Sequence, residues 1–335
     1  MNRRTLFGMA MSATCIAGAA FAEDTRMLQQ QMPSLGRANA WLNSHPLSAA
    51  ELRGKVVLID FWTYTCINWR RTLPYVRAWA DKYRASGLVV VGVHTPEFSF
   101  ERDLDRVRRA ADEQRVSYPI AVDSDYAIWR AFHNEYWPAV YLVDAQGHIR
   151  HQQFGEGEYL RSEQTVQQLL AEAGFSGFDR SPVSVAPDGA EAAADWNNLR
   201  SAETYLGRAL GEHFSSRDPA ALQLNQWTLV GDWTRTDEYA LVNKGGGRVA
   251  HRFHARDVHL IMGGAARAQP VRVRVLIDGQ PPHAAHGLDV DASGNGTVSG
   301  PRMYQLIRQT GPIADRLIEI EFLDPGAQVF DFTFG

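Results

Sequence analysis

The sequence predicts two domains in series, an α/β sandwich followed by an all-β sandwich. The chain has 335 residues, and domains usually contain about 100 to 200 residues. Up to residue 174, apolar strand-like runs alternate with segments that have helical spacing, which favours an α/β sandwich. From Gln226 onward, short strand-like runs separated by turn signals follow one another without helical segments, as in a β-sandwich.

The first domain, residues 23–174, begins with two near-continuous apolar runs. Residues 55–62 and 88–93 are typical of strands covered on both faces. Between them, residues 68–84 have apolar side chains at helical spacing, and Pro74 predicts a kink there. The remaining predicted elements are a helix at 103–115, a strand at 139–143, a turn at 144–147, a strand at 149–154 and a helix at 163–173.

A proline-, glycine- and alanine-containing segment at 175–198 is predicted to be a linker. The second domain then spans residues 199–335. Its predicted strands are residues 227–233, 239–242, 248–253, 258–262, 271–277, 304–308, 317–322 and 329–334.

The first 22 residues have the pattern of a secretory signal peptide. Arg3 and Arg4 precede an apolar stretch, and Ala20-Phe21-Ala22 fits a cleavage site. The paired arginines also resemble a twin-arginine export signal, so the route stays open. We therefore expect a periplasmic or secreted protein.

The composition excludes several classes of protein. After residue 22 no run approaches the roughly 20 apolar residues that a membrane-spanning helix needs. The net charge is -4 and becomes -6 without Arg3 and Arg4. An acidic balance argues against a general nucleic-acid binder, so no nucleic-acid partner is expected. With 45% hydrophobic and 21% charged residues, the chain is not a disordered one.

Cys66 is the residue that most clearly suggests chemistry. Cys15 is removed with the leader, which leaves Cys66 as the single thiol in an oxidising compartment. It directly follows a buried strand and begins a helix, whose N-terminus should lower the pKa of the thiol below about 8.5. Pro138 immediately precedes another strand, where a cis proline fits. A buried, inert structural cysteine is the alternative.

These features resemble the thioredoxin superfamily, in which a cysteine at a helix start faces a cis proline. The segments FWTYTCINW, GVHTPEF and WPAVYLVD, followed by ETYLG, RFHARD, YQLIRQ and EIEFLDPG, look like the C-terminal region of DipZ-type proteins over residues 34–335. The resemblance implies a thioredoxin fold, thiol-disulfide oxidoreductase chemistry and a membrane electron donor. It also implies a jelly-roll sandwich similar to carbohydrate-binding modules, so a glycan is a candidate ligand of the second domain.

The sequence departs from that family at Trp69, which stands where the second cysteine of Cys-x-x-Cys is expected. Because an indole cannot resolve a mixed disulfide, three activities remain. Cys66 could form mixed disulfides with a protein substrate, resolved by an external protein or low-molecular-weight thiol. It could instead act as a one-cysteine peroxidase; Thr63 fits the peroxidase motif, but Ile59 stands where its proline is expected. Alternatively, the protein is a redox-inactive binding protein that recognises a protein or glycan.

The candidate site therefore consists of Cys66 as the nucleophile and a group of residues that shape its surroundings: Trp62, Thr63, Thr65, Trp69 and Pro138. His94 and Glu97 follow the second strand at its carboxyl end and could assist proton transfer, although an ordinary loop role is the simpler interpretation. No cofactor and no metal are expected. His251 and His259 are expected on one face and His254 on the other, which would not suit a shared ion.

Overall fold

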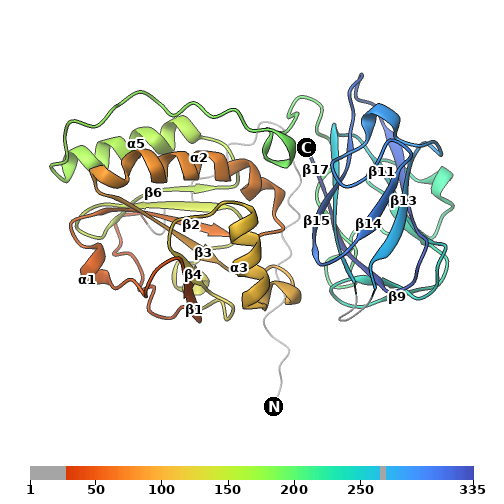
Figure 1. Cartoon of the computed structure of the whole chain (residues 1–335), viewed down its shortest axis with the longest axis horizontal. Coiled ribbons are helices and arrows are strands. Elements are labelled where there is room, and N and C mark those ends of the chain that lie inside the picture. Colours follow the sequence, from red (N-terminus) through yellow and green to blue (C-terminus); the bar gives the residue numbers. More distant parts are fainter. Residues whose placement is uncertain (1–27, 265–268) are drawn as a thin grey trace, which may run out of the picture. The chain divides into compact units, whose positions relative to one another are not determined.

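The computed structural model describes residues 28–264 and 269–335. The chain divides into an N-terminal unit that extends to Ala192 and a C-terminal unit that begins at Ala193. The two units are shown in Figure 1. The predicted signal peptide lies outside the described residues. Among those residues, no helix combines the length and the apolarity needed to cross a lipid bilayer.

The N-terminal unit has a thioredoxin fold built on one six-stranded sheet in the order β1-β4-β3-β2-β5-β6. β2 runs parallel to β3 and antiparallel to β5. The strands are β1 (Ala40–Leu42), β2 (Val56–Trp62), β3 (Leu88–His94), β4 (Ile120–Val122), β5 (Ala139–Val143) and β6 (Ile149–Phe154). The helices are α1 (Ala49–Leu52), α2 (Ile67–Tyr83), α3 (Leu104–Glu113), α4 (Ala127–Ala131) and α5 (Tyr159–Glu172).

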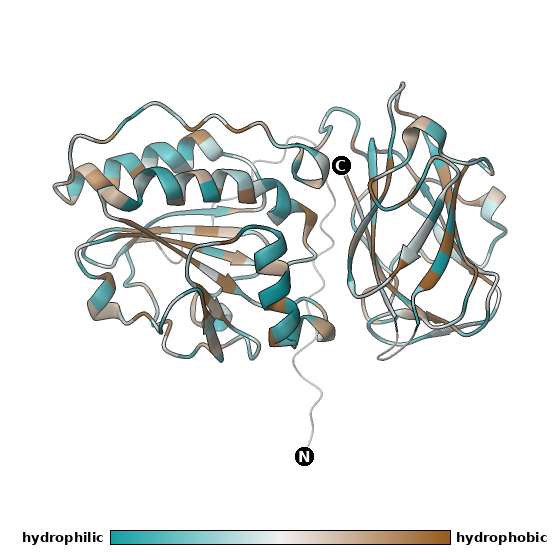
Figure 2. Ribbon diagram, in the orientation of Figure 1, coloured by the Kyte–Doolittle hydropathy of each residue, from teal (hydrophilic) through white to brown (hydrophobic). Residues whose placement is uncertain are grey.

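Helices cover both faces of this sheet, which explains why its central strands β2 and β3 are mostly apolar (Figure 2). Side chains of α2, α3 and α5 pack on one face, with Leu58 and Leu142 from the strands. Residues of α1 and α4 pack on the other face, with Ile59 and Tyr141. Alternate residues of each strand therefore enter different cores.

The segment predicted to be a linker is packed along much of its length. Phe175, Phe178 and Val183 contact the core under α2 and α5. The backbone N–H of Val183 donates to both carboxylate oxygens of Glu163, at 3.0 and 2.9 Å. The 3-10 helix η4 (Gly189–Glu191) lies against α2. The first compact unit thus includes most of this segment.

The C-terminal unit consists of two antiparallel sheets. One has the order β15-β12-β17-β10-β9, with β7 also paired to β17, and the other has the order β14-β13-β16-β11-β8. The strands are β7 (Thr204–Tyr205), β8 (Trp227–Val230), β9 (Trp233–Arg235), β10 (Ala240–Val242), β11 (Gly247–Phe253), β12 (Asp257–Gly264), β13 (Val271–Ile277), β14 (Asn295–Val298), β15 (Arg302–Arg308), β16 (Arg316–Phe322) and β17 (Ala327–Phe334). Apolar residues of both sheets form one core between them, as in a β-sandwich.

Three details of the predicted strands are wrong. The single strand expected at 227–233 is two strands, β8 and β9, because Gly231 turns the chain with a φ of 101°. β14 was not among the predicted strands. His251 and His259 do not share a face: they belong to strands of different sheets.

Candidate functional site

The thioredoxin fold brings Cys66 and Pro138 together at one end of the two neighbouring strands β2 and β5. Phe61, near the end of β2, pairs with Ala139, the first residue of the antiparallel strand β5. Cys66 follows β2 and Pro138 directly precedes β5, so the two strand ends carry both residues to one place. The Trp137–Pro138 peptide bond is cis, as predicted.

Cys66 is the N-cap residue of α2, as expected from the sequence. Its backbone N–H donates to the carbonyl of Thr63 at 3.2 Å, and its carbonyl accepts from the N–H of Arg70 at 3.1 Å. The side chain is 9% exposed. The thiol donates to the carbonyl oxygen of Trp137, with 3.8 Å between sulfur and oxygen. A thiol at this position lies beside the amides of the first helical turn, which stabilise a thiolate.

Trp137 is a site residue that the sequence analysis did not identify. Its indole Nε1 donates to the carbonyl of Thr95 at 3.1 Å, and its ring lies 4.3 Å from that of Trp129. The carbonyl that faces Cys66 is therefore held by contacts to the loop after β3 and to α4. Its place directly before the predicted cis proline Pro138 was the sequence signal that could have identified it.

Trp69 occupies the face of α2 that points at the sheet, and its indole is anchored there. Its Nε1 donates to Oδ2 of Asp60 at 3.0 Å, and its ring stacks on Trp62 at 4.3 Å. Trp62 and Trp69 are both fully buried. The two tryptophans therefore shape the site from beneath and do not form its surface.

Asp60 is a buried carboxyl under the site. Its Oδ2 also accepts from the hydroxyl of Tyr118 at 3.2 Å. Burial raises the pKa of Asp60 to about 7, although the bonds from Trp69 and Tyr118 oppose that rise. A charged residue inside the apolar run at 55–62 was the one sequence signal that could have identified it.

His94 lies at the end of β3, next to Trp62 in the sheet register. It is fully buried, and neither ring nitrogen has a hydrogen-bond partner in another described residue. Burial lowers the pKa of His94 to about 3, so the imidazole is neutral at ordinary pH. The structure thus places His94 in the site region as an uncharged group with its ring against Trp62 and Tyr64.

Thr65 and Glu97 lie on opposite sides of a second buried carboxyl, that of Glu101. The hydroxyl of Thr65 donates to Oε1 of Glu101 at 2.7 Å. The backbone N–H groups of Glu97 and Phe98 donate to Oε2, at 2.7 and 3.0 Å. Glu97 thus contributes its backbone here, and its half-buried side chain takes no part in these bonds. Thr63 is fully buried just before Tyr64.

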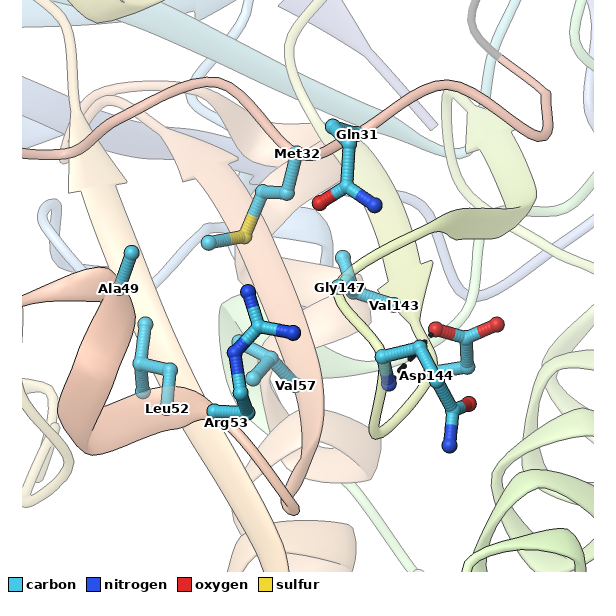
Figure 3. A pocket seen from close by; sticks show the side chains of 10 residues that line it. Gln31, Met32, Ala49, Leu52, Arg53, Val57, Val143, Asp144 and Gly147 are labelled. Carbon is cyan, nitrogen blue, oxygen red and sulfur yellow. Dashed lines mark hydrogen bonds between the residues drawn. The ribbon is translucent and has the colours of Figure 1, made fainter.

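The described residues also form a pocket that lies away from this site. The pocket in Figure 3 is lined by Met32, Arg53 and Val57, among others. Val57 is at the start of β2 and Cys66 follows its end, so this pocket lies at the opposite end of that strand from Cys66. Among the described residues, no group of three histidine, cysteine or acidic side chains is placed to hold a metal ion.

The histidines of the sandwich have separate partners. Nδ1 of His254 lies 2.6 Å from Oδ1 of Asp315. The ring of His251 packs against Phe332 and Phe334 in the core. His259 lies on β12 in the other sheet.

Comparison with known proteins identifies the class of both units. Residues 28–152 match the AhpC/TSA family, and residues 201–335 match the thioredoxin-like C-terminal domain family. The thiol-disulfide oxidoreductase YkuV of Bacillus subtilis is 38% identical over 145 residues, which cover 43% of this chain and 97% of YkuV. The chain belongs to the thioredoxin-like thiol-disulfide oxidoreductase family.

Within that family, the chain resembles protein DipZ along nearly its whole length. DipZ of Mycobacterium bovis is 36% identical over 341 residues, which cover 97% of this chain and 45% of DipZ. The chain thus spans about half the length of this relative. A solved structure, described as a thioredoxin-like protein in the oxidized form, is 39% identical with a TM-score of 0.40 and covers 43% of this chain and 97% of its own.

Proposed function

We propose that the protein is an exported thiol-disulfide exchange protein that acts through Cys66 alone. The observation that carries the proposal is Trp69, whose indole fills the position three residues after Cys66 and is hydrogen-bonded to Asp60. Since positions i and i+3 share a helix face, a resolving thiol would have to stand there. Export is supported by the leader-like residues 1–22.

The proposed reaction exchanges one disulfide for another. The Cys66 thiolate attacks a substrate disulfide, forms a mixed disulfide and releases one substrate sulfur as a thiolate. An external protein or low-molecular-weight thiol, once deprotonated, then attacks the mixed disulfide and restores the Cys66 thiolate. No net electrons enter or leave the protein in this cycle. A net reduction would need a second external thiol or a membrane electron donor.

The peptide carbonyl of Trp137 and the cis proline after it form the wall that faces the sulfur. A substrate chain is proposed to lie against this wall, so Pro138 would position the substrate backbone and Thr65 would fix the loop before the nucleophile. Trp62 and Trp69 support the site from the core.

The test uses a Cys15→Ala variant, in which Cys66 is the single thiol. After incubation with glutathione disulfide, intact mass spectrometry is expected to show one glutathione per chain, removed again by reduced glutathione. Cys66→Ser in the same background is the control and should gain no glutathione. Failure of the folded protein to form the adduct would contradict the proposal and would favour a redox-inactive binding protein.

Trp69→Cys tests the assignment of the missing partner. In the Cys15→Ala background, the glutathione adduct should become short-lived and give way to an internal disulfide between residues 66 and 69. Trp69→Ala is the matched control, because it also removes the buried indole but adds no thiol. A lasting adduct in a folded Trp69→Cys variant would show that the loss of the second cysteine is not what limits the site.

A one-cysteine peroxidase is the second candidate, supported by the match of residues 28–152 to the AhpC/TSA family. Ile59, where a peroxidase motif has proline, is instead a core residue of β2. Consumption of hydrogen peroxide by the Cys15→Ala protein, lost in Cys66→Ser, would favour this candidate.

For the sandwich, a protein or glycan ligand is proposed. Exposed aromatic rings are the side chains that would stack on a sugar. Trp196, just before the sandwich, is 57% exposed, whereas Trp227 and Tyr304 are buried in the sandwich core.

A further inference from the structure

We propose that Glu101 is a positioning residue for Cys66: it holds the residue before the nucleophile, and its buried charge restrains deprotonation of the thiol. This inference rests on the proposed role of Cys66 as a nucleophile. Glu101 belongs to the 3-10 helix η3 (Ser99–Arg102), which follows β3 and is far from Cys66 in sequence.

The geometric part of the inference depends on Thr65. Its hydroxyl donates to Oε1 of Glu101 at 2.7 Å, and both side chains are fully buried. Thr65 is bonded directly to Cys66, so this contact fixes the backbone from which the thiol projects. Cys66 itself has no side-chain cap bond to the helix. The hydroxyl–carboxylate bond is therefore a side-chain restraint on the residue directly before the N-cap of α2.

The electrostatic part depends on the charge of Glu101. Burial raises its pKa, and the Thr63 side chain acts to lower it. Three further donors bond its oxygens: the hydroxyl of Thr65 and the backbone N–H groups of Glu97 and Phe98. Each of them donates a hydrogen bond, and such donors favour the carboxylate form. Glu101 makes no ion pair with another described residue. The charge of Glu101 also acts on the adjacent loop. Burial is the largest cause of the raised pKa of Tyr64, and the charge of Glu101 is the next largest.

Other groups also act on this loop and must stay constant in a test. The ionisable groups near Glu101 and this loop come from β2, β3, η3, α3 and the loops around them. They are Asp60, Tyr64, His94, Glu97, Arg102, Asp103, Arg106, Arg109, Tyr118 and Tyr126. None of them bonds Thr65 among the described contacts. Glu101 is thus the acidic group joined to the residue that precedes the sulfur.

A purely structural interpretation is that Glu101 only caps its own turn through the N–H groups of Glu97 and Phe98. That role would affect folding but would not change how Cys66 titrates. The two interpretations separate when the charge and the Thr65 contact are removed independently.

The experiment compares three variants in the full-length Cys15→Ala protein. Glu101→Gln keeps an oxygen acceptor but removes the charge. Thr65→Val keeps the charge but removes the contact, and Thr65→Ser restores the hydroxyl. The readouts are the ¹³C NMR titration of the Cys66 Cβ, which needs no redox activity, and the rate of reaction with glutathione disulfide. Asp105→Asn is the control for loss of a carboxylate, because the side chain of Asp105, in the first turn of α3, is exposed.

Glu101→Gln is expected to move the Cys66 titration midpoint to lower pH by about one pH unit, since a like charge is removed. Thr65→Val is expected to slow the reaction with glutathione disulfide about tenfold because the nucleophile is less well oriented. Thr65→Ser should restore the rate. The control should leave the midpoint unchanged.

The inference is overturned if the midpoint of Glu101→Gln equals that of Asp105→Asn and the three residues at position 65 give equal rates. Should Glu101→Gln not fold, the comparison of Thr65→Val with Thr65→Ser decides, and equal rates would overturn it. If the parent protein forms no glutathione adduct, the proposed function fails, while the NMR midpoints still decide the role of Glu101.

Discussion

Asp60 in the N-terminal unit and Asp257 in the C-terminal unit are both fully buried carboxyls, but their partners differ. Asp257 lies between Arg308 and Arg256, with distances of 2.6 and 2.7 Å to its oxygens. Asp60 has only the neutral donors Trp69 and Tyr118. Burial without a cation raises the pKa of Asp60 to about 7. Burial also acts to raise the pKa of Asp257, but the bonds from its arginines hold it below the ordinary value.

The two carboxyls therefore differ in whether a cation accompanies the buried group. At Asp257 the buried charge is neutralised by two arginines, which limits the cost of burial. Beneath Cys66, two carboxyls and a neutral imidazole are buried without an ion-pair partner among the described residues. Titratable groups with strongly shifted pKa values tend to gather at functional sites.

The largest effect is expected for Asp60→Asn. Between pH 3.8 and about 7 the folded protein keeps a proton that the unfolded chain releases, so the wild type loses stability as the pH rises through this window. Each unit of pKa shift corresponds to about 1.4 kcal/mol, so the wild type loses about 4 kcal/mol of stability across this window. In the variant, the asparagine amide has an N–H without an acceptor, which costs about 1 kcal/mol. Asparagine should therefore stabilise the N-terminal unit by about 3 kcal/mol at pH 8.

Urea unfolding at pH 4, 6 and 8 measures this change, with the exposed Asp81→Asn as control. The gain should vanish at pH 4, close to the ordinary pKa of 3.8, because little of the pH-dependent penalty of the wild type is left there to offset the unpaired amide N–H. A destabilisation at pH 8 would show that Asp60 is stabilised as a carboxylate, and the contrast between the units would disappear.

Asp257→Asn should have the opposite sign. The folded pKa of Asp257 is lowered, so its ion pairs contribute stability above pH 3.8 that is lost as the pH falls through the folded value. Loss of charge-assisted bonds to Arg308 and Arg256 is expected to destabilise the C-terminal unit by about 2 kcal/mol at pH 7. Urea unfolding at pH 7 and pH 3 tests both the size and the pH window. An unchanged transition at pH 7 would mean that the attraction between Asp257 and its arginines only compensates the cost of burying the charges.

Effects of equal or smaller size are expected for two buried histidines, one in each unit. Burial lowers the pKa of His94 and of His251 to about 3, so the wild type loses stability as the pH falls from about 6.5 toward 3. His94→Phe should gain about 2 kcal/mol at pH 5. His251→Phe should gain about 1 kcal/mol less, because Nε2 of His251 lies 3.3 Å from Oγ1 of Thr204.

Acid unfolding followed by circular dichroism compares the two histidine variants. The order of the two gains is the critical result. An equal or larger gain for His251→Phe would contradict the difference in hydrogen bonding between the two sites.

Local sequence patterns were enough to predict the elements that carry the site. The apolar run before Cys66 predicted β2, the helical spacing after it predicted α2, and the strand after Pro138 predicted β5. β1 and β4 were missed because three-residue strands show no periodicity.

The network beneath the sulfur could not be predicted in the same way. Glu101 reaches Thr65 across 36 positions of sequence, and Tyr118 reaches Asp60 across 58. Such contacts depend on how the loops after β3 and α3 pack, which no local pattern encodes. The identity of Trp69 was visible in the sequence, but its bond to Asp60 was not.

The central claim is that Cys66 is a working nucleophile supported by the polar groups beneath it. The direct test is the rate of Cys66 alkylation by iodoacetamide against pH in the folded Cys15→Ala protein, compared with the same protein unfolded in urea. The account predicts alkylation of the folded protein with a midpoint below the free-thiol value of about 8.5. Alkylation that proceeds only after unfolding would contradict it and would leave a thioredoxin scaffold without thiol chemistry.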